Sequence, residues 1–350
     1  MGKSFLRVSV CFAFAALAAV SAFAADSVKW QVQTAEVAGT ARFVCSEYFA
    51  KLVGEKTGGR LQIELFSADT LYPTMNVMEA VTFGMTPAAL TSSDYLAGKE
   101  PMLKFAAYRP SDPWNLRFDF DEGLYKRTND LVRKAYERNG VHYVGSTLGQ
   151  PGEAFHATVP INKVSDLQGL RVRSAGLGQE MYESCGAAVV VMPMGDVYTA
   201  LKLSTISAAE IGGYVDNYQL ALFEVVKYNI EPAPHASSGF TIGQLIVNND
   251  AWAALPDDLK KIVEECVDES REWSWNYLNE QNKIFRKKFE DAGTTTLTLP
   301  PEEVALIKDK ALGFTKNYWG RNDLLDQYFE IYIKFLEDSG FKEAADKLRK

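Results

Sequence analysis

The sequence has 350 residues, of which 12% are aromatic and 23% are charged, and its formal net charge at pH 7 is −8. A chain of this length with so many large apolar side chains can form two hydrophobic cores, so we expect two domains. The excess of acidic residues argues against nucleic acid or an anionic membrane surface as a partner.

The first 24 residues have the pattern of a cleavable signal peptide. Lys3 and Arg7 form a basic start, an apolar run follows at 8–20, and small residues lead to a cleavage site after Ala24. The apolar run is shorter than the roughly 18 residues that a membrane-spanning helix needs. We therefore expect an exported protein located in the periplasm. Loss of Lys3 and Arg7 would leave 35 basic and 45 acidic residues, a net charge of −10.

The segments that follow alternate between strand and helix patterns. Alternating and short apolar runs predict strands at 27–35, 61–66, 87–91 and 141–147. Helical spacing of apolar residues predicts helices at 39–56, 75–83 and 115–138. This order predicts an α/β domain with a parallel sheet.

A second unit of the same kind comes next. Its predicted strands are 154–159, 170–174, 187–192 and 208–211, with helices at 177–185 and 194–203. A long strand at 240–248 is expected to return to the first domain. We therefore place domain I at 25–150 plus about 240–285, and domain II at 151–239 plus about 286–350.

The longest helical pattern begins at Pro256 and continues to about Glu290 without a Gly or Pro. Trp273, Trp275 and Tyr277 fall on different faces of it, so a coiled-coil heptad is not kept. We expect one helix packed along both domains. Two more predicted helices, 301–318 and 323–337, close the chain.

Motifs for catalysis and metal binding are missing from the sequence. It has no CxxC, HExxH, phosphate-binding glycine loop or Gly-x-Ser-x-Gly, and its three histidines, His142, His156 and His235, are not at metal-ligand spacing. Three cysteines remain after the leader, an odd set that is no disulfide framework. We therefore expect a protein that is not an enzyme and has no cofactor.

Arg173 is the first candidate for a ligand contact. It ends a short predicted strand and precedes the glycine-bearing loop 175–178. Ligands of α/β folds are bound at strand ends, and a planar guanidinium can donate two parallel hydrogen bonds to a carboxylate. A surface salt bridge is the alternative for any single Arg.

Together these features resemble the periplasmic solute-binding subunits of TRAP (tripartite ATP-independent periplasmic) transporters. The resemblance rests on the leader, the two α/β units, the late long helix and the run 164–173, and it covers 28–340. Segments 95–105 and 207–214 are most similar to the branch that binds 2-oxo acids and other monocarboxylates. The resemblance implies a two-domain α/β periplasmic binding protein fold, with a cleft between the domains and a long helix spanning both.

The resemblance also implies roles for residues of this chain. Arg173 would pair with the ligand carboxylate, and Gln150 at the hinge would contact the ligand or an ion. Glu210 matches an acid that coordinates a cation beside the substrate. However, Ile211 stands where that branch has Trp, and 234–239 lacks its second acid, so a hard cation would lose oxygen ligands. We therefore doubt a bound sodium or calcium ion, for which Gln150 and Glu210 are the only candidate ligands.

Further ligand contacts are implied at Tyr95, Ile211, Tyr214, Asn217 and His235. Ile211 would leave room for a bulkier ligand group than Trp would. Tyr95 could equally be a half-buried core residue, and Asn217 could form a local bond in the first turn of a helix predicted at 216–226. We expect Glu153 and His156 to lie on the surface.

The predicted function is capture of a small organic anion and its delivery to the membrane subunits of a transporter. The ligand class stays open among 2-oxo, hydroxy and aromatic acids and sulfonates, because each offers an anion to one Arg. Two alternatives are an exported enzyme that acts on organic acids and a ligand-sensing periplasmic module.

Overall fold

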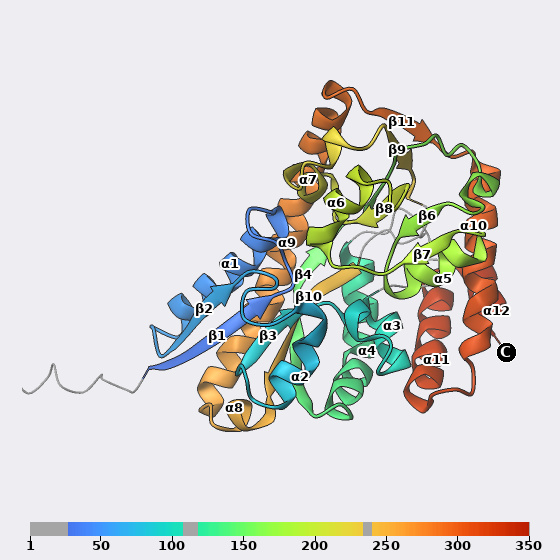
Figure 1. The fold of residues 1–350 in the computed structure, drawn as a ribbon. Coiled ribbons are helices and arrows are strands. Elements are labelled where there is room, and N and C mark those ends of the chain that lie inside the picture. Colours follow the sequence, from blue (N-terminus) through green and yellow to red (C-terminus); the bar gives the residue numbers. More distant parts are fainter. Residues whose placement is uncertain (1–26, 108–117, 234–239, 350) are drawn as a thin grey trace, which may run out of the picture.

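The protein is described here by a computed structural model that covers residues 27–107, 118–233 and 240–349 (Figure 1). The expected signal peptide and His235 lie outside these residues. Within them, no helix combines the length and the apolar character needed to cross a membrane.

The first sheet has five strands in the order β2-β1-β3-β10-β4. Their bounds are β1 (Val28–Thr34), β2 (Leu61–Phe66), β3 (Ala88–Thr91), β4 (Val141–Gln150) and β10 (Phe240–Asn248). β1 is parallel to β2 and β3, but β10 is antiparallel to both β3 and β4. The predicted parallel arrangement is therefore confirmed for β1, β2 and β3, but the sheet as a whole is mixed because β10 is antiparallel to its neighbours. β4 leads out of the sheet and β10 returns to it, so the two strands run in opposite directions; the predicted return of β10 is confirmed.

The second sheet has six strands in the order β11-β9-β5-β8-β6-β7. Their bounds are β5 (Ala154–Ala157), β6 (Arg171–Arg173), β7 (Ala188–Val190), β8 (Ala208–Ile211), β9 (Tyr228–Glu231) and β11 (Thr295–Thr298). β6 is parallel to both β7 and β8, whereas β5 is antiparallel to β8 and β9. We call each sheet with the helices packed on it a lobe (Figure 1).

Helices cover both sheets. Those up to β4 are α1 (Ala41–Lys56), α2 (Val77–Thr82), α3 (Pro101–Ala107) and α4 (Phe118–Glu137), with 3-10 turns η1 (Thr74–Asn76) and η2 (Ser93–Leu96). Those between β5 and β9 are α5 (Gly176–Ser184), α6 (Val197–Lys202) and α7 (Tyr214–Gln219), with η3 (Val164–Leu167), η4 (Met194–Asp196) and η5 (Leu222–Glu224). The remainder are α8 (Asn249–Ala253), α9 (Asp257–Asp291), α10 (Pro301–Thr315), η6 (Lys316–Tyr318), α11 (Asp323–Asp338) and α12 (Lys342–Leu348).

The long helix α9 runs along both lobes (Figure 1). It packs on β4 and α1 at the first lobe and on α7 at the second. Val263 and Val267 lie in the core beneath the first sheet, whereas Phe289, near the other end, lies in a core with residues of the second lobe. The predicted helix that spans both domains is therefore present.

The chain after α10 crosses back toward the first sheet. α11 packs on α3 and α4, where Leu325 and Phe329 share a core with Leu131 and Val132. α10 instead packs on α5 of the second lobe. The predicted domain boundaries stay a prediction, and these contacts show that the C-terminal helices are divided between the two lobes.

Candidate functional site

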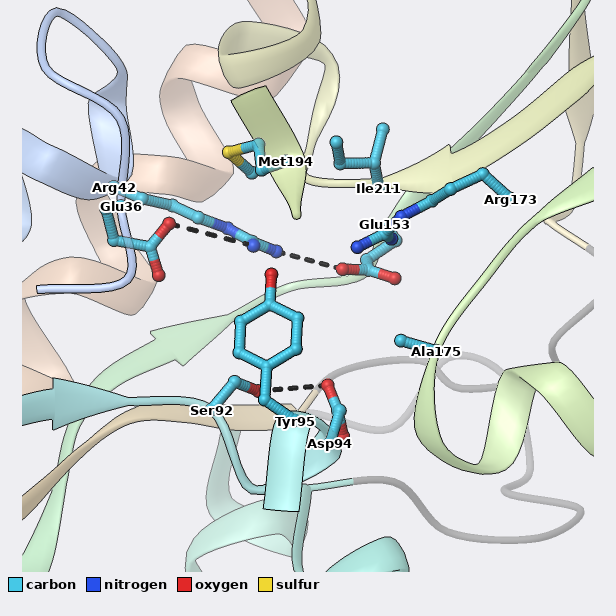
Figure 2. A pocket seen from close by; sticks show the side chains of 10 residues that line it. All are labelled: Glu36, Arg42, Ser92, Asp94, Tyr95, Glu153, Arg173, Ala175, Met194 and Ile211. Atoms are coloured by element: carbon cyan, nitrogen blue, oxygen red, sulfur yellow. Dashed lines mark hydrogen bonds and ion pairs between the residues drawn. The ribbon is translucent and has the colours of Figure 1, made fainter. Parts of the chain in front are cut away.

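A pocket lies between the two lobes (Figure 2). Loops and turns after β1 and β3 and the first turn of α1 line one side, and the other side comes from the segment after β4 and from the ends of β6 and β8. The lining residues are Glu36, Arg42, Ser92, Asp94, Tyr95, Glu153, Arg173, Ala175, Met194 and Ile211. The space among their atoms, including its opening, is about 400 Å³, but only about 20 Å³ can hold the centre of a water molecule. The lobes are therefore close together around the pocket.

Arg173 is held by backbone carbonyl groups. It ends β6, a strand with neighbours on both sides, and is only 5% exposed. Nη1 donates to the carbonyl oxygen of Glu210 at 2.7 Å, and Nε and Nη2 donate to that of Met192 at 3.1 and 2.9 Å. These bonds fix the guanidinium plane and leave two of its five N–H groups for another acceptor. No carboxylate of a described residue forms an ion pair with it.

Glu210 and Glu153 form a hydrogen-bonded pair of carboxyl groups beside Arg173. Glu210 is 1% exposed and also accepts a bond from the Ser174 hydroxyl at 3.1 Å. Burial raises the pKa of Glu210 well above its usual value, Glu153 raises it further, and Arg173 acts in the opposite direction. A hydrogen bond between two carboxyl groups requires a proton, so the pair carries at most one negative charge.

Arg42 links the two lobes through carboxylates. It lies in the first turn of α1, which Thr40 caps by accepting from the N–H of Phe43. Nη2 of Arg42 is 3.0 Å from Glu153 Oε1, and Nε is 3.8 Å from Asp216 Oδ2. The Arg42 N–H also donates to Asp216 Oδ1 at 2.9 Å. One end of α1 is thus bound to the start of α7 and to the segment after β4.

Glu36 is a further buried acid, located just after β1. Its carboxylate lies 4.0 Å from Nη1 of Arg42 and is 6% exposed. Burial raises the pKa of Glu36 to about 7, against the lowering effect of Arg42, while Asp216 and Glu153 raise it further. Glu36 is therefore about half protonated at neutral pH.

The predicted contacts fall into three groups. Arg173, Tyr95 and Ile211 line the pocket, and Glu210 lies beside it. Burial raises the pKa of the Tyr95 hydroxyl, which therefore stays protonated.

Gln150 and Asn217 are fully buried in supporting positions. Gln150 Oε1 accepts from Arg42 Nε at 3.1 Å, and its Nε2 donates to the carbonyl oxygen of Gly152 at 2.8 Å. Asn217 donates to the carbonyl oxygens of Ile211 and Gly212, both at 3.2 Å, and so holds the end of β8 in place.

Tyr214 is directed elsewhere. Its hydroxyl is 2.5 Å from Glu231 Oε1, and its ring meets His156 and Phe289 edge-on. It lines a separate groove beside α9, with Arg286, and is not among the residues that line the pocket of Arg173. His235 lies outside the described residues.

The expectation that Glu153 and His156 lie on the surface is wrong. The Glu153 side chain is 5% exposed, and His156 is fully buried because β5 lies between β9 and β8. The Nδ1 atom of His156 is 2.8 Å from Asn229 Oδ1, and burial lowers the pKa of His156 to about 4. It is therefore a neutral core residue at neutral pH.

Most of the pocket residues that belong to the first lobe were not predicted from the sequence. Glu36, Arg42, Ser92 and Asp94 were not predicted, although Glu36, Ser92 and Asp94 follow the ends of β1 and β3. The argument that selected Arg173, a charged side chain at a strand end, would have selected Glu36 and Asp94 as well.

Each candidate ligand for a cation already has a hydrogen-bond partner in this arrangement. Gln150 Oε1 accepts from the positively charged Arg42, and the Glu210 carboxyl group accepts from Ser174 and is hydrogen-bonded to Glu153. Over the described ranges, no cluster of three or more His, Cys, Asp or Glu residues could hold a metal ion.

Comparison with known proteins places this chain in a family. A family model described as bacterial extracellular solute-binding protein, family 7, matches residues 38–321. A monocarboxylate 2-oxoacid-binding periplasmic protein of Nostoc sp. is 33% identical over 248 residues, or 70% of this chain. The match spans 66% of that relative, just under two thirds of its length.

Solved structures of TRAP solute-binding proteins have the same fold. One from Bordetella bronchiseptica, with copurified calcium and picolinate, has a TM-score of 0.81 and 23% identity and covers 91% of this chain and 95% of its own. One from Pseudoalteromonas atlantica, with bound sodium and pyruvate, has a TM-score of 0.81 and 20% identity and covers 92% of this chain and 98% of its own. From the family match and this shared two-domain fold, the chain belongs to the bacterial extracellular solute-binding proteins of family 7, the TRAP solute-binding proteins that its sequence resembles.

Proposed function

We propose that this protein is the extracytoplasmic solute-binding subunit of a TRAP transporter, and that it captures a small organic acid, a 2-oxo acid or another monocarboxylate. The ligand carboxylate pairs with Arg173 in the pocket between the lobes. The lobes close on the ligand, and the loaded protein delivers it to the membrane subunits of the transporter. No chemical conversion is part of this function.

The observation that carries the proposal is the environment of Arg173. Arg173 is 5% exposed, its guanidinium is fixed by two carbonyl oxygens, and within the described chain no carboxylate forms an ion pair with it. A buried cation without an ionic partner is costly, and a ligand carboxylate that accepts its two remaining N–H groups would remove that cost. The relatives that bind a 2-oxo acid, pyruvate or picolinate support an organic acid as the ligand.

The proposal is tested by screening organic acids for thermal stabilisation of the purified protein and then measuring their Kd by calorimetry. An acid present at a hundred times its Kd is expected to add about 2.7 kcal/mol of stability. Arg173→Lys keeps the positive charge but loses the planar guanidinium that can donate two parallel hydrogen bonds, and we expect it to weaken binding by roughly 30-fold or more. Arg171→Lys, an exposed change two residues earlier on β6, serves as the control. Equal affinity in Arg173→Lys and wild type would contradict the assignment of the carboxylate to Arg173.

A further inference from the structure

The pocket contains three polar groups whose hydrogen-bonding capacity the protein does not use up. Arg173 has two N–H groups to spare, and neither the Tyr95 hydroxyl nor the Glu36 carboxyl forms a hydrogen bond with a described residue. All three residues line the same small space. In Figure 2, Glu36 and Arg173 lie on opposite sides of the Tyr95 hydroxyl.

Arg42 alone does not neutralise a negative charge on Glu36, because it is shared with two other acids. Arg42 is its ion-pair partner at 4.0 Å, but Arg42 lies closer to Glu153, at 3.0 Å, and to Asp216, at 3.8 Å. The groups that face Glu36 are therefore Arg42 from α1, Asp216 from α7, Glu153 from the segment after β4 and the Tyr95 hydroxyl from η2. A negative charge on Glu36 needs another hydrogen-bond donor or a positive charge beside it.

We propose that Glu36 is a second contact of the ligand, and that the ligand is a small carboxylic acid that also carries an N–H or O–H donor. This inference rests on the proposed function, since Arg173 holds the carboxylate. The second group then donates to Glu36 across the pocket. The class comprises 2-amino, 2-hydroxy and cyclic N–H acids, whereas a 2-oxo acid offers only acceptors to Glu36.

The two kinds of ligand differ in how their binding depends on pH. An ammonium group needs ionised Glu36 as its counter-charge, and a hydroxyl or neutral N–H group donates a stronger hydrogen bond to ionised than to protonated Glu36. The binding of such acids therefore tightens as pH rises through about 7, the value to which burial raises the pKa of Glu36. The keto oxygen of a 2-oxo acid instead needs protonated Glu36 as its donor, so its binding weakens over the same range.

The experiment compares four probes, pyruvate, L-lactate, L-alanine and pyroglutamate, by calorimetry on the purified protein at pH 6 and pH 8. At pH 8 we expect at least one of the three donor-bearing acids to bind about tenfold more tightly than pyruvate, and the gap to narrow at pH 6. Glu36→Ala is expected to abolish the preference. Glu36→Gln cannot ionise, so the preference should lose its pH dependence.

Glu64→Gln, an exposed change on β2, is the matched control and should behave as wild type. Thermal unfolding of each variant establishes that it is folded. If Glu36→Ala does not fold, Glu36→Gln alone carries the test. Pyruvate binding as tightly as the best donor-bearing acid at pH 8, or a preference that persists in Glu36→Ala, overturns the inference but not the proposed function. Failure of every organic acid to bind wild type overturns both.

Discussion

At Glu210 the fold holds a carboxyl group where water cannot reach it. Burial and the adjacent Glu153 raise the pKa of Glu210 well above its usual value. The folded protein thus keeps a proton that the unfolded chain releases above a pH of about 4.3. The contribution of Glu210 to the free energy of unfolding is therefore fully present below that pH and is lost as pH rises toward the pKa of Glu210 in the folded protein.

Glu210→Gln should remove this loss. The amide can donate to Glu153 and accept from Ser174, and it does not ionise. We expect the variant to be more stable than wild type at pH 8, and to match it near pH 4.5. Denaturant unfolding at the two pH values measures this. Parallel pH profiles for wild type and variant would show that Glu210 is ionised in the folded protein.

The candidate site could be predicted from sequence only in part, for reasons visible at single residues. Arg173 is found because a strand end is recognisable locally, whereas Ile211 is found only through the family resemblance. Glu153 is missed because its burial depends on Arg42, which is far away in the chain. Tyr214 has the position of a pocket residue in sequence, but its bond to Glu231 is a contact between α7 and β9 that no local pattern encodes.

At the scale of elements, prediction succeeds where the pattern is long or regular. Strand 61–66 and the ends of α9 agree with the sequence to within one residue, because α9 has no Gly or Pro in its interior and Pro256 stands just before it. β9, β11, α3 and α12 were not predicted, since each has only four to seven residues and too little periodicity. The direction of β10 depends on which strand it joins, which only the tertiary structure determines.

The contact between β4 and α9 depends on a glycine. A Cβ at Gly149 would lie 3.0 Å from the carbonyl oxygen of Arg271 and 3.3 Å from the Cβ of Trp275. Gly149→Ala should therefore force α9 away from the strand and cost about 1–3 kcal/mol. Gly54→Ala within α1, where nothing lies within 4 Å of the added Cβ, should instead stabilise by about 0.5–1 kcal/mol. Thermal unfolding of both variants gives the comparison, and equal effects would refute the packing argument.

For the whole molecule, the structure brings the lobes together by contacts on several sides of the pocket. Arg42, which lines the pocket, joins Glu153 and Asp216, and the N–H of Ala41 donates to Gln219 Oε1 at 2.7 Å. Outside the pocket, Lys104 on α3 pairs with Glu180 on α5, and both bond to the Tyr318 hydroxyl. The two-domain class follows from the order of elements in the sequence, but these contacts join residues far apart in the chain and could not be predicted from it.

The pair Lys104–Glu180 offers a test of closure that leaves the pocket unchanged, because neither residue lines it. Both side chains are only about one fifth exposed, so solvent screens the pair in part. Lys104→Glu places two carboxylates together and should favour the open arrangement. The apparent Kd for an organic acid then rises by roughly 5-fold, since only the closed fraction binds tightly. Adding Glu180→Lys restores an attractive pair and should recover most of the affinity. An unchanged Kd in Lys104→Glu, measured at low salt where such pairs are strongest, would show that ligand capture does not depend on the lobes meeting at α3 and α5.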